Sequence, residues 1–295
     1  MRSFKIVLIP LVMLIACSPL SLIPTPLPTQ EPISSSTLTP APRPSDDIIL
    51  TDTQEVLNKM GALCCEEGWW NHLSEAEYNS DEARENGDEF DTGAAFLENL
   101  EVASERFDPN EYFTILTHLA PEDGYVLDYV YFAPGGGDGA PYLYARRESE
   151  PAFANYSAYQ SAGVENYLSH IQVDGTAEGY YELAVLSIMG GQFYLSWHFE
   201  YNDWEVVSNR ERLDAIIEWL NEKYAPLTEE QVEAALQLDV TPLAKFEGDK
   251  VRVWILVFTK WGGFYERAYT IDRDFPHQMI ADDIQLIPYD CGIVY

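Results

Sequence analysis

Hydrophobic and polar residues alternate along several stretches of the chain, and these stretches predict β-strands. Residues 125–132 place tyrosine and leucine side chains on one face and the intervening side chains on the other. Residues 142–146 follow a loop rich in glycine and proline, and we expect them to pair back on this strand. Two further strands are expected at 181–189 and 192–199, because Gly190-Gly191 between them allows a tight hairpin turn.

The C-terminal part of the chain predicts a second group of strands. Residues 250–259 contain the longest apolar run of the body. The Trp-Gly-Gly sequence at 261–263 is expected to turn the chain into a partner strand at 264–272. A last strand is expected within residues 284–294.

Helix-start signals separate these strands. Asp108 followed by Pro109 predicts a helix that runs to about Leu119, since aspartate accepts the first free amides and proline fits the first turn. Two later pairs have the capping-box spacing and predict a helix before Pro226 and a short acidic helix after it: Ser208 with Glu211, and Thr228 with Gln231.

Helices and antiparallel hairpins in separate blocks predict an α+β fold, with antiparallel sheets and a few flanking helices. We expect two subdomains, an α+β domain at 46–226 and a mainly β subdomain at 227–295. The boundary is placed at Pro226, where the first capped helix is expected to have ended.

The N-terminus has the pattern of an export signal. Arg2 and Lys5 precede a short apolar run, which closes on Leu14-Ile15-Ala16-Cys17. This ending resembles the lipobox of bacterial lipoproteins. The resemblance implies that residues 1–16 are a signal peptide, that Cys17 carries lipid, and that the protein is anchored to the cell membrane and faces its extracytoplasmic side.

Residues 17–45 are expected to form an extended tether between this anchor and the folded body. Residues 18–45 hold eight prolines and ten serines or threonines. Proline removes amide donors and fixes φ, so such a stretch forms neither helix nor sheet.

The net charge of the chain limits the classes of partner that it can bind. Removal of residues 1–16 takes away Arg2 and Lys5 and no acidic residue, which leaves 15 basic and 49 acidic side chains and a net charge of −34. A chain this acidic is repelled by nucleic-acid phosphates, so we expect no nucleic-acid partner. The membrane is expected to be contacted through the lipid anchor.

Three cysteines remain once Cys17 is assigned to lipid. An exported protein meets an oxidising compartment, so we expect Cys291 to form a disulfide with Cys65 or with Cys64. A disulfide between the adjacent cysteines and three buried thiols are the alternatives.

The named catalytic patterns are missing: the sequence has no Gly-x-Ser-x-Gly, Walker or His-Glu-x-x-His motif. It also indicates no catalytic residue, no metal ligand set and no cofactor. Aromatic side chains near predicted loops and strand faces are the candidate binding residues, since exposed rings stack on sugars or serve as protein hot spots. These candidates are Trp69, Trp70, Tyr129, Tyr131 and Trp261.

These observations favour a non-catalytic envelope protein that binds a ligand or partner, with glycan or protein as the candidate ligand. An extracytoplasmic hydrolase of glycan or peptide that uses carboxylates is the alternative. A structural component of an envelope complex is the third interpretation.

Overall fold

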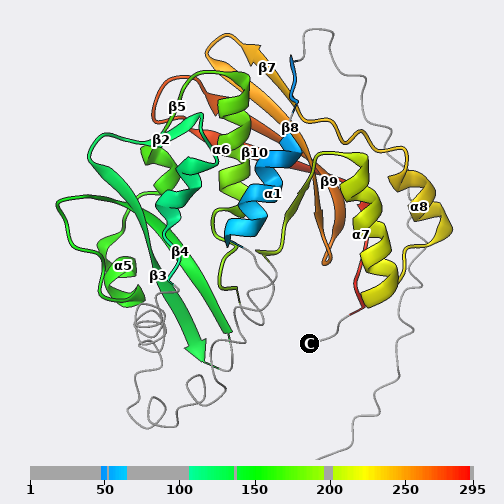
Figure 1. The fold of residues 1–295 in the computed structure, drawn as a ribbon, viewed down its shortest axis with the longest axis horizontal. Helices are drawn as coiled ribbons and strands as arrows, with labels where there is room; N and C mark the ends of the chain where they lie inside the picture. The colour runs from blue at the N-terminus through cyan, green and yellow to red at the C-terminus, as the bar shows by residue number, and fades with distance from the viewer. Residues whose placement is uncertain (1–47, 52, 65–105, 136–137, 196–201, 293–295) are drawn as a thin grey trace, which may run out of the picture. The chain divides into compact units, whose positions relative to one another are not determined.

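The computed structural model describes residues 48–51, 53–64, 106–135, 138–195 and 202–292. All of them belong to one compact unit, Thr39–Tyr295. The fold is α+β, as the sequence predicts. Its largest part is a six-stranded antiparallel sheet (Figure 1). Five of its strands lie in the order β1-β7-β8-β9-β10, and β6 pairs with the same edge of β8 as β7, farther along that strand. The strands are β1 (Ile48–Ile49), β6 (Glu205–Val207), β7 (Leu243–Glu247), β8 (Lys250–Thr259), β9 (Gly263–Asp272) and β10 (Met279–Pro288).

Two smaller antiparallel pairs stand beside this sheet. The strands β2 (Leu119–Pro121) and β5 (Ile171–Val173) form one pair, and β3 (Tyr125–Gly135) and β4 (Asp138–Arg147) form a long ribbon. The short α5 (Tyr156–Ala162) follows the ribbon, and two 3-10 helices, η2 (Pro109–Thr114) and η3 (Tyr167–His170), precede β2 and β5.

A buried helix, α6 (Ala177–Met189), joins these parts into one core. It contacts β2 and β5 on one side and β6, β7 and β8 on the other. In Figure 1 it stands between the ribbon and the large sheet, with α1 (Thr53–Cys64) beside it. Eleven of its thirteen residues are buried. The main core therefore surrounds α6 and is closed by Leu57 and Met60 of α1.

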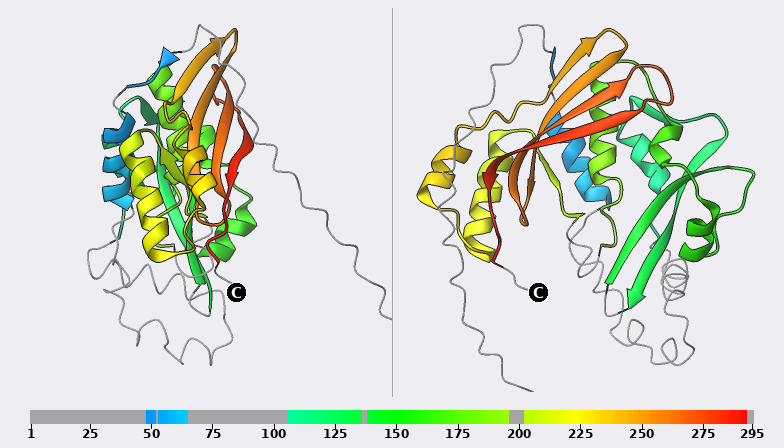
Figure 2. Two further views of the ribbon diagram at one scale, coloured as in Figure 1. Left: turned by 90° about the vertical axis from the view of Figure 1, so that its right-hand side faces the viewer. Right: turned by 180° about the vertical axis from the view of Figure 1, so that it is seen from behind.

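A second core lies on the opposite face of the sheet, under α7 (Arg210–Lys223) and α8 (Glu229–Ala235). Leu213, Ile216 and Leu220 of α7 pack against Leu256 and Phe258 of β8. Both views of Figure 2 place these two helices at one end of the sheet. The large sheet thus contacts α6 on one face, through β6, β7 and β8, and contacts α7 and α8 on the other face only near this end.

The structure corrects the prediction of two strands around Gly190-Gly191. Residues 177–189 form α6, and Gly190 is its C-cap with a right-handed helical backbone. Beyond its first turn the helix is buried on nearly every side and mostly apolar, so its sequence shows no helical period and fits the pattern of a buried strand. The local sign of its start is Thr176, whose hydroxyl accepts a hydrogen bond from the amide of Gly179 at 3.0 Å.

Three smaller boundaries also differ from the prediction. The element after Asp108 is the 3-10 helix η2, which ends at Thr114 and not near Leu119. The cap of α7 is Asn209 and not Ser208, and Asn209 accepts from the amide of Arg212. The last strand begins at Met279, five residues before the predicted start.

The large sheet crosses the subdomain boundary expected at Pro226. β1 and β6 come before this residue, yet they pair with β7 and β8, which come after it. The predicted signal peptide, Cys17 and tether lie outside the described residues. None of the helices in the described ranges is long and apolar enough to cross a membrane.

Candidate functional site

A cleft of about 480 Å³ opens where α1, the C-terminal end of α6, β6 and the first turn of α7 meet. We call it the α1–β6 cleft. This volume lies within the range of about 300–1,000 Å³ that is typical of small-molecule sites. Its lining residues are Gln54, Leu57, Asn58, Gly61, Ala62, Met189, Gln192, Leu195, Asp203, Trp204, Glu205, Val206 and Arg212.

Hydrogen bonds fix the α1 wall of this cleft. The side-chain amide of Gln54 donates to Asn58 Oδ1 at 2.8 Å, one helical turn along α1. Gln54 Oε1 accepts from the hydroxyl of Ser208 at 2.8 Å, and Ser208 lies between β6 and α7. This bond joins segments 154 residues apart and holds α1 against the opposite wall.

Two carboxylates line the opposite wall. Asp203 Oδ1 accepts from the hydroxyl of Thr259 at 2.7 Å, and its Oδ2 lies 3.6 Å from Lys260 Nζ. Glu205 Oε1 pairs with Arg212 Nε. Burial raises the pKa of both carboxyl groups, although these cationic and hydroxyl neighbours oppose the shift. The negative charge of Asp203 raises the pKa of Glu205 further.

Trp204 lies between these two acidic residues in the sequence, and its indole ring is packed against neighbouring side chains. Arg267 stacks over Trp204, with its guanidinium carbon 4.3 Å from the ring centroid, and Tyr265 packs edge-on at 5.3 Å. The amide of Gln192 donates to the carbonyl of Trp204 at 2.7 Å and to that of Ile188 at 3.0 Å. The ring is thus held in place before any ligand binds.

Three groups at the cleft keep hydrogen-bonding capacity that the described residues do not use. These are the amide nitrogen of Asn58, Oε2 of Glu205 and the terminal nitrogens of Arg212. The first and third are donors and the second is an acceptor. The cleft therefore combines open donors, an open acceptor and apolar surface from Leu57, Met189 and Val206.

A second polar cluster lies at the other end of α6. His118 Nδ1 is 2.7 Å from Asp174 Oδ2, and Asp174 also accepts from the hydroxyl of Thr176 at 2.6 Å. The backbone amide of His118 donates to Glu182 Oε2 at 2.8 Å. The hydrogen bond to Asp174 raises the pKa of His118, whereas burial raises the pKa of Glu182 to about 7. Because the partners are backbone and neighbouring side chains, this cluster primarily fixes the start of α6 against β2.

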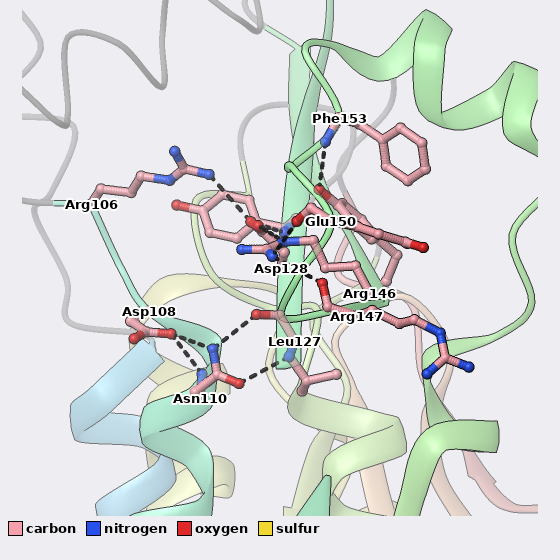
Figure 3. A network of polar contacts seen from close by, with 11 residues as sticks. Arg106, Asp108, Asn110, Leu127, Asp128, Arg146, Arg147, Glu150 and Phe153 are labelled. Carbon is pink, nitrogen blue, oxygen red and sulfur yellow. Dashed lines mark hydrogen bonds and ion pairs between the residues drawn. The ribbon is translucent and has the colours of Figure 1, made fainter. Parts of the chain in front are cut away.

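A third network holds the β3–β4 ribbon to the chain that precedes η2 (Figure 3). Asp128 Oδ2 accepts from Arg146 Nε at 2.8 Å, and its Oδ1 lies 3.4 Å from Arg106. Arg146 also donates to the carbonyl of Glu150 at 2.8 Å, and Asn110 bonds both backbone groups of Leu127 at 2.9 Å. This network stabilises the fold, since each of its charged side chains has a partner of opposite charge within the protein.

The predicted aromatic binding residues are not brought together. Tyr129 and Tyr131 are only 1 % and 2 % exposed, so neither ring presents a face to a ligand. The prediction for these two is wrong, because alternate positions of β3 face the core and not solvent. Trp261 is half-buried in the second core, with Lys260 Nζ 5.0 Å from its ring centroid. Trp69 and Trp70 lie outside the described residues.

Cys291 is a buried free thiol, 4 % exposed, in the second core. The side chains of its predicted partners, Cys64 and Cys65, lie outside the described residues. The disulfide therefore gains no support at Cys291 and stays a prediction. Among the described residues, no group of three or more His, Cys, Asp or Glu side chains is arranged to hold a metal ion.

Sequence reasoning missed the cleft because its walls come from four separate segments. One local signal was present: Asp203 and Glu205 flank a tryptophan at the start of a short strand, where alternate side chains share a face. A scan against protein-family models finds no match to this chain, and searches of curated proteins and of solved structures find none either.

Proposed function

We propose that this chain is a lipid-anchored extracytoplasmic protein that binds a hydroxyl-rich ligand, such as a glycan, in the α1–β6 cleft. One observation carries the proposal: Asn58, Arg212 and Glu205 line the same cleft, and the described residues leave donors of the first two and an acceptor of the third unused. A hydroxyl both donates and accepts, so a polyol satisfies all three groups at once. Trp204 and the apolar side chains of the cleft would cover the C–H faces of a sugar ring.

Binding without catalysis is favoured by the contacts that the carboxylates already make. Asp203 is held by Thr259 and Lys260, and Glu205 by Arg212. A group fixed by such partners orients a ligand well, because little side-chain entropy is lost on binding.

A glycan array probed with the purified full chain tests the ligand class. The affinity for the glycan that binds most strongly on the array is then measured for the unchanged chain and for Glu205→Gln. This substitution keeps the shape of the side chain but removes the charged acceptor. A hydrogen bond to a charged group contributes about 1.5–3 kcal/mol, so we expect an affinity loss of about tenfold or more. Asn58→Ala removes a neutral donor on the exposed side of α1, and we expect a loss of about threefold to tenfold.

Glu211→Gln is the matched control, since Glu211 is exposed on the first turn of α7 and does not line the cleft. We expect its affinity to stay within about twofold of the unchanged chain. An array that retains no glycan contradicts the proposal. So does a pair of cleft variants, Glu205→Gln and Asn58→Ala, that both bind as tightly as the unchanged chain.

The anchor is tested separately. Cys17→Ala, or treatment of the producing cells with globomycin, is expected to abolish lipid labelling and to release the protein from membranes. Unchanged partition into the membrane fraction would show that Cys17 is not the anchor.

Hydrolysis of the bound glycan is the second candidate function, and the raised pKa values of Asp203 and Glu205 favour it. A raised pKa favours the protonated form of a carboxyl group, which is the form that acts as a general acid. Mass spectrometry of a retained glycan after long incubation distinguishes the two functions. Cleavage that disappears in both Asp203→Asn and Glu205→Gln supports hydrolysis, whereas an intact glycan supports binding alone.

A further inference from the structure

A second concave surface lies between α7 and α8. Its volume is about 370 Å³, and its lining is mainly apolar. We call it the α7–α8 groove. It is lined by Asp214, Ile217, Glu218, Asn221, Glu222, Val232 and Leu236. No residue of this groove lines the α1–β6 cleft.

The floor of the groove is apolar and open to solvent. Ile217 and Val232 are partly buried against the second core, and Leu236 is 47 % exposed at the C-cap of α8. Burial of this leucine by a partner would remove apolar surface from water, which favours association.

The rim of the groove carries one sign of charge. Asp214, Glu218 and Glu222 are spaced four residues apart on α7, so they follow one stripe along the helix. None of the three has an ion-pair partner within the described part of the chain. Residues 209–239 as a whole contain eight acidic and three basic side chains, a net charge of −5.

The groove is held open by the protein itself. The guanidinium of Arg210, at the start of α7, donates to the carbonyl of Leu236 at 3.0 Å and also to that of Leu238. Thr228 and Gln231 form a complete capping box that fixes the start of α8. The two walls are therefore positioned before a partner arrives, and less ordering is required on binding.

We propose that the α7–α8 groove docks a basic amphipathic helix of a partner protein, with apolar anchors on Ile217, Val232 and Leu236 and lysine or arginine side chains against the acidic stripe. Asp214 and Glu222 are about 12 Å apart along α7, or roughly two helical turns. A partner helix that places apolar side chains at positions i, i+4 and i+8 spans this length.

Charge argues against the other occupants. A second copy of this chain would bring the same acidic stripe against the first, and like charges that meet at an interface repel. An anionic lipid surface would be repelled in the same way.

The probe for this site is a synthetic amphipathic peptide of leucine and lysine, about four helical turns long. A second peptide replaces each leucine by serine and keeps every lysine. Fluorescence anisotropy with the full chain is expected to show binding at least about tenfold tighter for the leucine peptide, since only that peptide fills the apolar floor.

Two variants of the chain localise the binding. Leu236→Ser removes an exposed apolar anchor, and we expect it to weaken binding about tenfold. Glu218→Gln removes one rim charge, and we expect a loss of about threefold. Glu211→Gln is again the matched control, because it changes the net charge equally on the same helix but lies outside the groove.

The proposal fails if the serine peptide binds as tightly as the leucine peptide, because binding is then electrostatic alone. It also fails if Leu236→Ser and Glu218→Gln leave the affinity unchanged. Sedimentation velocity tests the remaining occupant: self-association of the full chain that Leu236→Ser abolishes would assign the groove to a second copy instead.

Discussion

The buried carboxyl group of Glu182 makes the stability of this fold depend on pH. Glu182 lies on α6, is 4 % exposed, and accepts the backbone N–H of His118. Burial is the main cause that raises its pKa from 4.5 to about 7, and the negative charge of Asp174 adds to the shift. Between these two pH values, therefore, Glu182 is protonated in the folded protein and ionised in the unfolded chain.

The sign and size of the effect follow from this difference. A carboxyl group whose folded pKa exceeds its unfolded pKa stabilises the fold most at low pH, and the stabilisation falls as pH rises from about 4.5 to about 7. One pKa unit corresponds to about 1.4 kcal/mol, so the free energy of unfolding is expected to fall by up to about 3 kcal/mol across this window because of Glu182 alone.

Glu182→Gln isolates this contribution. Glutamine is neutral at every pH and its carbonyl oxygen can still accept the N–H of His118. The free energy of unfolding is measured by urea titration at about pH 5 and about pH 8 for both proteins. The variant is expected to gain stability relative to the unchanged chain by about 2.5 kcal/mol between the two values, and common contributions cancel in the difference.

Glu178→Gln is the matched control for this experiment. Glu178 lies in the first turn of the same helix but is exposed. Loss of its charge near the helix N-terminus is expected to cost about 0.3–1 kcal/mol. The dependence of this cost on pH is expected to be much weaker than for Glu182→Gln, because Glu178 is only a minor cause of the raised pKa of His118. If the Glu182→Gln difference depends on pH no more than this control, the carboxyl group is ionised throughout and the reasoning from burial is wrong.

Three further substitutions test separate parts of the fold by urea unfolding. Thr228→Ala removes the capping box of α8 and is expected to cost about 1 kcal/mol; no loss would mean that the helix does not depend on its cap. Gly263→Ala is expected to cost more than about 2 kcal/mol, because a Cβ would lie 2.1 Å from the carbonyl oxygen of Ile287 and φ is +97°. A fully stable Gly263→Ala protein would refute the close strand contact. Asp128→Asn leaves Arg146 without its charged partner and is expected to cost about 1.5–3 kcal/mol, an expectation that a change below about 0.5 kcal/mol would contradict.

Elements with local signals could be predicted from the sequence. The β8–β9 hairpin is expected from the apolar run within residues 250–259 and the turn residues Gly262-Gly263, and the antiparallel pairing of the two strands confirms it. The α8 cap follows from Thr228 and Gln231 alone. In both cases the residues that determine the element lie within the element, so tertiary context is not needed to read them.

α6 could not be predicted because its surroundings determine its form. Its apolar residues satisfy the pattern of a buried strand as well as that of a buried helix, and packing against strands on both sides favours the helix that Thr176 caps. The α1–β6 cleft is hidden for a related reason. Gln54 and Ser208 meet across 154 residues, and nothing near either residue in the sequence indicates the contact.

The two proposed sites are expected to differ in their response to salt. Ligand binding in the α1–β6 cleft rests on hydrogen bonds to a neutral polyol, whereas docking in the α7–α8 groove draws on uncompensated rim charges. The Debye length falls from about 10 Å at 0.1 M salt to about 3 Å at 1 M, so the peptide affinity is expected to fall several-fold and the glycan affinity to change little.

Both sites share α7, which makes their independence testable. Arg212 in its first turn lines the cleft, while Asp214, Glu218 and Glu222 line the groove. α7 is fixed between them by Leu213, Ile216 and Leu220, which are buried in the second core. A helix held in this way transmits little displacement, so saturation with the leucine peptide is expected to change the glycan affinity by less than about twofold. A tenfold change measured by calorimetry would instead mean that α7 moves on peptide binding and that its core contacts have two arrangements.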